Sequence, residues 1–402
     1  MKSIALIFIA YLLIAANPTY AQKTNDPVKD EGYGFTEEFR LAHTAVPNQY
    51  RSGTCWSFAG ISFLESELLR SGKDSINLSE MFIVNHCYYD KAKRYVRMHG
   101  HLNFGGGGAF HDVIHVMKNY GLTTEDAYPG LEYGTEKHVH GELDNLLTEK
   151  VKAVVENKNR TLTPVWEKTV KSDIESYLGQ LPENFNFNNK AYSPKSFVSD
   201  YMKLNPDDYI EISSFTHHPF YEKFILEVPD NWLWGEVYNV KLNEMMQIID
   251  YCLDNGYTVA WASDVSHKGF SYSKHGLAVI PEADITSMNN LELAKWTELS
   301  QSEKNEMLYK FDKPGKEKDV TQAMRQEAFD NYSTTDDHGM HIIGKAKDKN
   351  GTPYYIVKNS WGKSGPYEGY FYASKDFVKL QTTNIMVNKN ALPKDIKKKL
   401  DL

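Results

Sequence analysis

The 402-residue sequence has little cysteine, no excess of positive charge and no long apolar run beyond its first residues. Three cysteines cannot staple a chain of this length, so a small disulfide-rich scaffold is excluded. The chain has 45 Lys and Arg residues and 53 Asp and Glu residues, which gives a formal net charge of -8. Such a balance offers no electrostatic footprint for nucleic acid or for an anionic membrane, and we expect neither as a partner.

The overall composition is that of an ordinary globular protein. Hydrophobic residues make up 41% of the chain and charged residues 24%, so the chain can bury a full-sized core. At about 150 residues per domain, the length predicts two to three domains, or one domain with a large insertion.

The first residues have the pattern of a signal peptide. Lys2 precedes an apolar run over residues 4–16, and Asn17-Pro18 then breaks the helix before the small residue Ala21. The run is shorter than the ~20 residues of a membrane span, and no later stretch approaches that length. We therefore expect residues 1–21 to be cleaved and the mature chain to be periplasmic or secreted, with an uncleaved N-terminal anchor as the alternative.

One of the three cysteines has unusual surroundings. Cys87 and Cys252 lie in helix-like stretches, where cysteine is usually a small buried hydrophobe. Cys55 instead follows a polar, glycine-containing stretch and begins an apolar-periodic run, so a loop should enter a helix at this residue. The positive end of a helix can lower a thiol pKa from ~8.5 towards ~3.5–7.5, which favours a nucleophilic thiolate.

Two C-terminal runs supply groups that a thiolate needs. The segment from His338 to Gly344 and the segment that ends at Asn359 read as neighbouring strands, joined by an Asn350-Gly351 turn. A histidine before the first strand and an asparagine after the second can then lie side by side. A thiolate needs an imidazole as its proton partner, and the imidazole needs a fixed acceptor that holds its tautomer.

These residues together resemble the papain-like cysteine peptidases. The resemblance rests on Gln49-x5-Cys55-Trp56, on His338 before a strand, and on Asn359-Ser360-Trp361-Gly362. The resemblance is more detailed for the branch of bleomycin hydrolase and aminopeptidase C, and it covers roughly residues 49–390. The motifs that match this branch are Asp90-Lys91, Gly106-Gly107-Gly108, Tyr120-Gly121-Leu122, Tyr128-Pro129, Tyr177-Leu178-Gly179 and Trp261-Ala262-Ser263-Asp264-Val265.

The resemblance implies a catalytic triad and an oxyanion hole. Cys55 would be the nucleophile, His338 the general acid and base, and Asn359 the residue that orients the imidazole. Gln49 would form the oxyanion hole with the backbone N–H of Cys55, which fits because a side-chain amide can donate to a developing oxyanion.

The resemblance also implies roles around the triad. Trp361 would shield the hydrogen bond between Asn359 and His338 from water. Gly107 and Gly108 would let an extended substrate backbone approach closely. The plainer interpretation of the glycines is a loop that enters a helix. The chemistry implied here uses no cofactor and no metal.

The fold that the resemblance implies is the α+β, two-lobed papain-like fold over residues 22–402. A helical left lobe would carry Cys55, and a β-barrel-like right lobe would carry the histidine and the asparagine. The interval between Cys55 and His338 exceeds what minimal papain-like enzymes need, so we expect a large helical insertion at about 131–322. One of its helices is expected near residues 294–311. In the resembling branch such additions build a closed hexamer, which makes a homo-oligomer possible here.

The implied function is that of an exported, thiol-dependent peptidase similar to aminopeptidase C, with peptides as substrates. In that branch a C-terminal arm enters the cleft and limits cleavage to free N-termini. Here only a short tail is expected after residue 380, which leaves an endopeptidase or a dipeptidyl peptidase open as alternatives. A non-catalytic peptide-binding protein on the same scaffold is the alternative from another class.

Two other histidine patterns compete with this interpretation. His341 lies three residues after His338, and side chains three apart in a strand point to opposite faces, so only one of them can face Cys55. The family motif favours His338. Separately, His111-Asp112-x-x-His115 resembles the zinc-protease pattern, but it has Asp in place of Glu and no clear third ligand. We therefore expect no metal site there.

Overall fold

A computed structural model of the chain describes residues 32–159 and 161–402. The expected signal peptide, residues 1–21, lies outside the described residues. Among the helices of the described part, none has the length and apolar character needed to cross a bilayer.

Three helices form the centre of a helical lobe: α1 (Cys55–Arg70), α2 (Glu80–Arg97) and α3 (Phe110–Asn119). Helix α1 begins at the residue that the sequence predicted. Gly60 lies where α1 and α3 meet, and a Cβ there would come within 2.7 Å of a methyl carbon of Val113. The glycine therefore permits the close contact that fixes α1 against α3. Ser79 caps α2, and its side chain accepts a hydrogen bond from the backbone N–H of Phe82.

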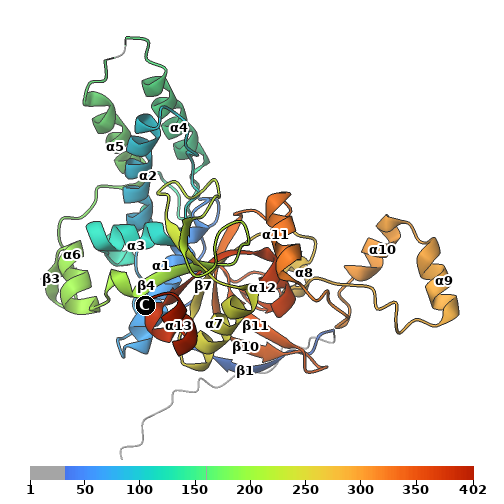
Figure 1. Cartoon of the computed structure of the whole chain (residues 1–402). Helices are drawn as coiled ribbons and strands as arrows, with labels where there is room; N and C mark the ends of the chain where they lie inside the picture. The colour runs from blue at the N-terminus through green and yellow to red at the C-terminus, as the bar shows by residue number, and fades with distance from the viewer. Residues whose placement is uncertain (1–31, 160) are drawn as a thin grey trace, which may run out of the picture.

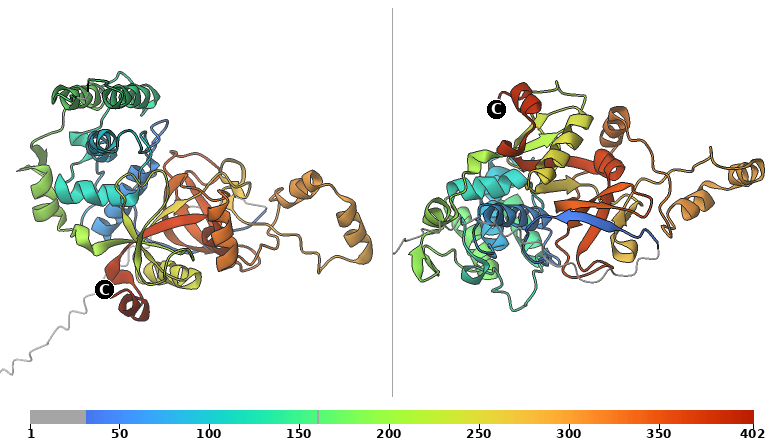
Figure 2. Two further views of the ribbon diagram at one scale, coloured as in Figure 1. Left: turned by 45° about the horizontal axis from the view of Figure 1, so that its top comes forward. Right: turned by 90° about the horizontal axis from the view of Figure 1, so that it is seen from below.

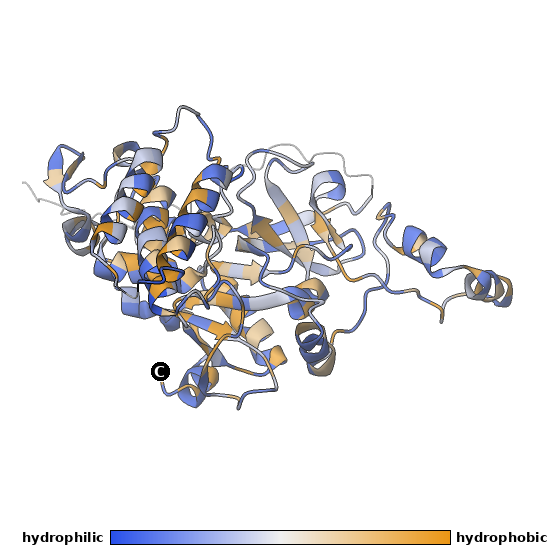
Figure 3. Cartoon of the chain, turned by 90° about the horizontal axis from the view of Figure 1, so that it is seen from above, coloured by the Kyte–Doolittle hydropathy of each residue, from blue (hydrophilic) through white to orange (hydrophobic). Residues whose placement is uncertain are grey.

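Two further helices cover the outer side of α2. They are α4 (Gly141–Val155) and α5 (Val165–Leu178), and they stand at one end of the molecule (Figure 1). Each buries one apolar stripe at helical spacing: Leu143, Leu147 and Val151 on α4, and Val170, Ile174 and Leu178 on α5. Much of their remaining surface is hydrophilic, which is drawn in blue in Figure 3.

A mixed sheet forms the centre of the second lobe. Its order is β5-β6-β4-β13-β7-β10-β11-β12-β9-β8, and β1 pairs with the end of β10. The helices packed around it include α7 (Leu242–Asp254), α12 (Lys375–Gln381) and the C-terminal α13 (Lys394–Lys399). The strands are β1 (Thr36–Arg40), β4 (Tyr209–Ser213), β5 (Lys223–Ile225), β6 (Glu236–Asn239), β7 (Val259–Ser263), β8 (Phe270–Ser271), β9 (Leu277–Ala278), β10 (His338–Lys347), β11 (Pro353–Lys358), β12 (Tyr370–Ser374) and β13 (Thr382–Asn388).

Shorter elements link the two lobes and lie on their surface. The hairpin β2–β3 and the π-helical turn after it pack on the helical lobe. The bounds of these elements are β2 (Phe185–Phe187), β3 (Lys190–Tyr192), α6 (Pro194–Ser196), the π-helical turn Phe197–Met202, α8 (Tyr272–His275), α11 (Gln322–Asp330), and the 3-10 turns Glu125–Ala127, Pro206–Asp208 and Lys389–Ala391.

The predicted hairpin in the C-terminal part is confirmed. Strands β10 and β11 pair antiparallel, with His341 opposite Lys358. The Asp348 carboxylate accepts hydrogen bonds from the backbone N–H groups of Asn350 and Thr352, and Gly351 takes a φ of +84° that few other residues tolerate. The hairpin therefore places the start of β10 beside the end of β11, where His338 and Asn359 lie.

The predicted α+β papain-like fold with two lobes is present, but one detail is not confirmed. Among residues 32–159 and 161–402 the strand path runs from β5 to β8 without a pairing that closes it into a barrel. The expected insertion at 131–322 stays a prediction as a unit. That range contains the outer helices, but it also contains the central strands β4 and β7.

The helix expected near residues 294–311 is two helices, α9 (Asn290–Glu298) and α10 (Gln301–Leu308). The break occurs because Ser300 caps α10: its side chain accepts from the backbone N–H of Glu303, whose carboxylate accepts from the N–H of Ser300. The pair projects from the side of the molecule opposite to α4 and α5 (Figure 2), and every residue in it is at least partly exposed.

Candidate active site

The Cys55 thiol lies at the first residue of α1, beside the start of β10. Burial raises the pKa of the thiol to about 11, while backbone hydrogen bonds from Gly339 and Trp56 favour the thiolate. The nearby carboxylates of Asp230 and Asp337 also raise this pKa. Within this environment the helix start does not by itself hold the group as a thiolate, so another group must take the proton.

His338 is placed to be that group. Its Nε2 donates a hydrogen bond of 2.8 Å to Oδ1 of Asn359, which also accepts from the backbone N–H of Ser360. With the proton of the neutral ring on Nε2, the Nδ1 lone pair is left to accept a proton. The indole of Trp361 stacks on the imidazole, with ring centroids 4.7 Å apart.

Burial also acts on the imidazole. It lowers the pKa of His338 to about 4, and the hydrogen bond to Asn359 offsets this only in part. Each group taken alone is therefore neutral at pH 7, and charge can arise only if the proton moves from the thiol to the ring. The thiolate and imidazolium then stabilise each other, so the two groups titrate as one coupled pair.

Gln49 is held close to this pair by a residue that the sequence analysis left without a role. Ser360 Oγ donates a hydrogen bond of 2.6 Å to Oε1 of Gln49, and the backbone N–H of Gln49 donates to the carbonyl of Ser360. With its carbonyl oxygen fixed, the Gln49 amide has its NH₂ group left to donate, and within residues 32–159 and 161–402 that group has no hydrogen-bond partner. Gln49 is buried, and it is not among the residues that line the cavity described below.

The glycine-rich segment before α3 forms the facing wall. Trp56 Nε1 donates to the carbonyl of Gly106, and Lys91 Nζ donates to the carbonyls of Gly105 and Gly107. A Cβ at Gly108 would come within 2.7 Å of the Trp56 ring, so this position must be glycine for the wall to pack. The close approach of a substrate backbone to Gly107 and Gly108 stays a prediction.

One cavity joins these elements. It has a volume of about 80 Å³, well below the ~300–1,000 Å³ typical of sites for drug-sized ligands. Cys55 and His338 both line it, together with Gly107, Gly108 and residues 226–231 in part. A larger cavity of about 570 Å³ lies near residues 184–188 and contains none of the predicted site residues.

Two models of cysteine peptidase families match two parts of the chain. Residues 37–190 match the model of the papain family of cysteine proteases, and residues 304–402 match that of the peptidase C1-like family. The first range holds Cys55, and the second holds His338 and Asn359. The chain is a papain-like cysteine peptidase.

Curated relatives of this cysteine peptidase align over most of its length. Aminopeptidase C of Lactococcus lactis subsp. lactis is 21% identical over 394 residues, which covers 88% of this chain and 83% of the relative. Aminopeptidase C of Listeria innocua serovar 6a is 23% identical over 397 residues, with 87% and 81% covered. The solved structure of PepW from Lactobacillus rhamnosis HN001 has a TM-score of 0.68 and 18% identity, and the match covers 91% of this chain and 84% of that one.

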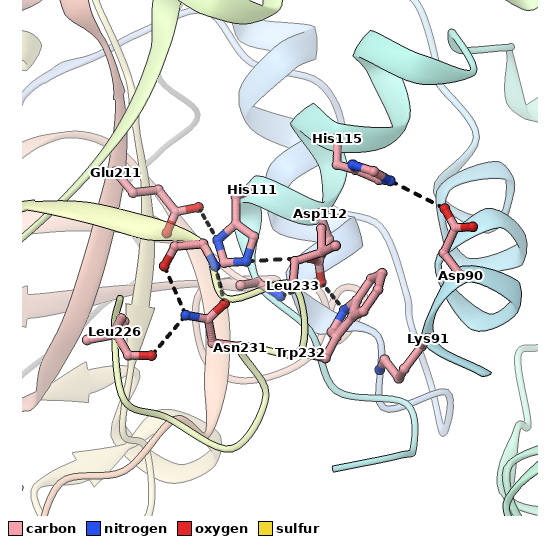
Figure 4. A network of polar contacts seen from close by, with 12 residues as sticks. Asp90, Lys91, His111, Asp112, His115, Glu211, Leu226, Asn231, Trp232 and Leu233 are labelled. Carbon is pink, nitrogen blue, oxygen red and sulfur yellow. Dashed lines mark hydrogen bonds and ion pairs between the residues drawn. The ribbon is translucent and has the colours of Figure 1, made fainter. Parts of the chain in front are cut away.

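The zinc-protease-like pattern of the peptidase does not converge on one point. His111 Nδ1 lies 3.0 Å from Glu211 Oε1, whereas His115 Nε2 lies 3.3 Å from Asp90 Oδ2 (Figure 4). Asp112 accepts from the indole N–H of Trp232 at 2.7 Å. Each member of the pattern thus holds a different neighbouring segment in place.

The other histidine and cysteine candidates are structural. His341 is buried, and its Nδ1 lies 2.8 Å from the hydroxyl of Ser62, away from Asn359. Cys87 and Cys252 are free, fully buried thiols, as the sequence predicted.

Two features of the site escaped sequence analysis. Ser360 stood inside the quoted Asn-Ser-Trp motif, and a hydroxyl next to the asparagine could have been considered as a positioning group. Residues 226–231 carried no signal, because they fall within the range assigned to the insertion. Their place at the cavity depends on contacts with segments more than 100 residues away.

Proposed function

We propose that this peptidase is a thiol-dependent aminopeptidase that uses Cys55, His338 and Asn359 as its triad. The observation that supports the proposal most strongly is the 2.8 Å hydrogen bond that fixes the His338 tautomer on the cavity that Cys55 lines. Loss of any one of these three residues would have favoured a binding protein on the same scaffold. The chain has all three residues.

In the first half of the proposed reaction, Sγ of Cys55 attacks the scissile carbonyl carbon as His338 Nδ1 takes the thiol proton. The carbonyl oxygen becomes an oxyanion, which the Gln49 amide and the Cys55 backbone N–H stabilise. When the C–N bond breaks, His338 returns the proton to the leaving amine. The products of this half are a thioester on Cys55 and the shortened peptide.

In the second half, water replaces the amine. His338 takes a proton from the water, whose oxygen attacks the thioester carbonyl. The C–S bond then breaks, the thiolate recovers the proton from the imidazolium, and the released residue leaves as a free amino acid. Asn359 accepts from Nε2 throughout, and Trp361 keeps water away from that bond.

The aminopeptidase mode is supported by the relatives named Aminopeptidase C and by the small cavity at Cys55. An endopeptidase needs room for several residues on each side of the scissile bond. The cavity at Cys55, of about 80 Å³, is small against that requirement.

A matched pair of fluorogenic peptides tests this proposal. One peptide has a free α-amine and the other is N-acetylated, and each is assayed with and without a thiol alkylator and with Cys55→Ala. We expect cleavage of the free-amine peptide only, lost on alkylation and in the variant. Equal or better cleavage of the acetylated peptide would mean an endopeptidase, and no thiol-dependent turnover of either would mean a binding protein.

Export remains part of the proposal. It is supported by the signal-peptide pattern of residues 1–21, and N-terminal sequencing of the mature protein tests it. We expect the mature chain to begin at Gln22, and a chain that begins at Met1 in the cytosolic fraction would contradict export. A homo-oligomer, possible from the resembling branch, stays a prediction.

A further inference from the structure

The tip of one hairpin crosses the cavity. Strands β5 and β6 pair antiparallel, and the ten residues that join them, Leu226–Gly235, form the segment we call loop 226–235. Within it, Leu226, Val228, Asp230 and Asn231 line the same cavity as Cys55 and His338. The loop therefore belongs to the site, although it lies far from both residues in sequence.

The helical lobe holds this loop firmly. Trp232 Nε1 donates to the buried Asp112 carboxylate at 2.7 Å, and Arg94 Nη1 donates to the backbone carbonyls of Trp232 and Leu233 at 3.2 and 3.0 Å. Gly235 lies against the His111 ring, where a Cβ would come within 2.4 Å. These contacts attach the loop to both α2 and α3.

The opposite wall holds the loop as well. The backbone N–H of Asp230 donates to Oδ2 of Asp336 at 2.8 Å, two residues before His338. A loop fixed to α2 and α3 on one side and to the start of β10 on the other closes the cleft between them.

The Asp230 side chain then lies directly over the glycine-rich wall. Asn103 Nδ2 donates to its Oδ1 at 2.7 Å, and a Cβ on Gly107 would lie 2.0 Å from its Oδ2. An extended substrate backbone cannot pass along Gly107 while this carboxylate is there. A peptide chain that enters from Cys55 must therefore end before Gly107.

Three acidic side chains line this cavity and each accepts a hydrogen bond on one carboxylate oxygen, but Asp230 is the one whose other oxygen lies against Gly107. Oδ2 of Asp336 accepts from the loop, and Oδ2 of Asp337 accepts from the backbone N–H of Val265. Within residues 32–159 and 161–402, Oδ2 of Asp230 has no hydrogen-bond partner. Lys91 is the cation whose charge reaches Asp230, but its Nζ is bonded to the glycine carbonyls.

We propose that Asp230 binds the free α-amine of the substrate and that loop 226–235 thereby limits the enzyme to removing one residue at a time. This inference rests on the proposed function of Cys55 and names the residue that sets its substrate class. An ammonium group brings three donors and a positive charge to the open carboxylate oxygen. An acylated amine brings no charge, and its acyl group would overlap the carboxylate.

Three variants of the full-length chain test the role of the charge and of the side chain. In Asp230→Asn the bond from Asn103 and the side-chain shape are kept, but the charge is lost, and we expect kcat/KM for a free-amine substrate to fall about 10- to 100-fold. In Asp230→Ala the space over Gly107 opens, so cleavage of the N-acetylated peptide should rise at least several-fold as free-amine cleavage falls. Glu227→Gln is the matched control, because Glu227 is on the same loop but bonds to His217 and His218.

The design separates failure of this inference from failure of the proposed function. Wild-type turnover that depends on Cys55, together with an Asp230→Asn variant that loses less than threefold, would overturn the role of Asp230 alone. Release of dipeptides by the wild type would overturn the one-residue limit. The rate of Cys55 alkylation and the melting temperature are measured for every variant, and an Asp230→Asn variant that fails to fold leaves the test to Asp230→Ala, whose gain on the acetylated peptide a folding defect cannot produce.

Discussion

Cys55 and His338 line the same cavity as loop 226–235, but the two parts of this candidate site are built in different ways. His338, Asn359 and Trp361 come from one stretch of 24 residues, where a single hairpin brings them together. The loop is instead held by Asp112, Arg94 and Asp336, which belong to three separate segments.

This contrast indicates that the chemistry and the selectivity of the site depend on different levels of structure. The groups that we propose to move protons are set by local structure at element ends, so substitutions there should change the rate and little else. The groups that limit the substrate are set by long-range packing, so substitutions there should change stability and selectivity together. The predictions below test this division, starting with the largest effect.

Cys55→Ala should abolish turnover of every peptide, with a loss on the order of 10⁴ or more in kcat/KM. The thiol supplies the bond-forming atom, and no neighbouring side chain can replace it. Burst-free progress curves with purified variant would confirm this. Because the thiol is not part of the packing of loop 226–235, the melting temperature should stay within a few degrees of the wild type.

Gln49→Ala should lower kcat about 10²–10³-fold, because one of two oxyanion donors is removed. KM should change little, since the donor acts on charge that develops in the transition state. Steady-state kinetics on the free-amine peptide measure both constants. A variant with unchanged kcat would show that Gln49 is not an oxyanion donor.

His111→Gln should change the pH dependence of stability. Glu211 raises the pKa of His111 to about 9 against burial, while the unfolded value is ~6.5. A group with a raised pKa stabilises the folded state fully below pH 6.5, and this contribution is lost as the pH rises through 9. The difference in unfolding free energy between wild type and variant should therefore shrink by up to about 3 kcal/mol from pH 6.5 to 9. Urea titrations at several pH values measure it, and a constant difference would contradict the ion pair.

Trp232→Phe should weaken the attachment of loop 226–235. The change removes the donor to the buried Asp112 carboxylate, which costs about 1–3 kcal/mol of unfolding free energy. The loosened loop should also admit some N-acetylated peptide, a change that Gln49→Ala should not produce. Loss of stability without any gain on the acetylated peptide would show that the packing of loop 226–235 does not determine the selectivity.

Ser360→Ala should have the smallest effect, a fall in kcat of roughly tenfold or less, since one hydrogen bond contributes about 1 kcal/mol. Ser360 acts through Gln49, so the same change in the Gln49→Ala background should lower kcat very little further. A double-mutant cycle measures this coupling. Fully additive losses would mean that Ser360 does not position Gln49.

The sequence predicted the fold class and the side-by-side placement of His338 and Asn359, but not the position of loop 226–235 on the cavity. The helix start at Cys55 and the hairpin between His338 and Asn359 follow from local patterns of polarity and turn residues. The break between α9 and α10 had a local signal in Ser300 and Glu303 that the periodicity of the flanking residues obscured. Asp230 had none, because its position over Gly107 depends on how an edge hairpin packs against the other lobe.

The insertion predicted at about 131–322 shows the same limit of local sequence patterns, which do not reveal pairing between distant segments. The interval between Cys55 and His338 is long, but length alone does not separate outer helices from strands β4 and β7, which lie inside the sheet. Only pairing between distant segments makes that distinction, and loop 226–235 depends on it.

The most direct test of the account is a time course on one unlabelled peptide of about ten residues with a free N-terminus, with the products identified by mass spectrometry. We expect a ladder in which single residues are lost in order from the N-terminus, with no product when Cys55 is replaced by Ala. Internal fragments, or a ladder with steps of two residues, would contradict a cleft that Asp230 closes one residue from Cys55.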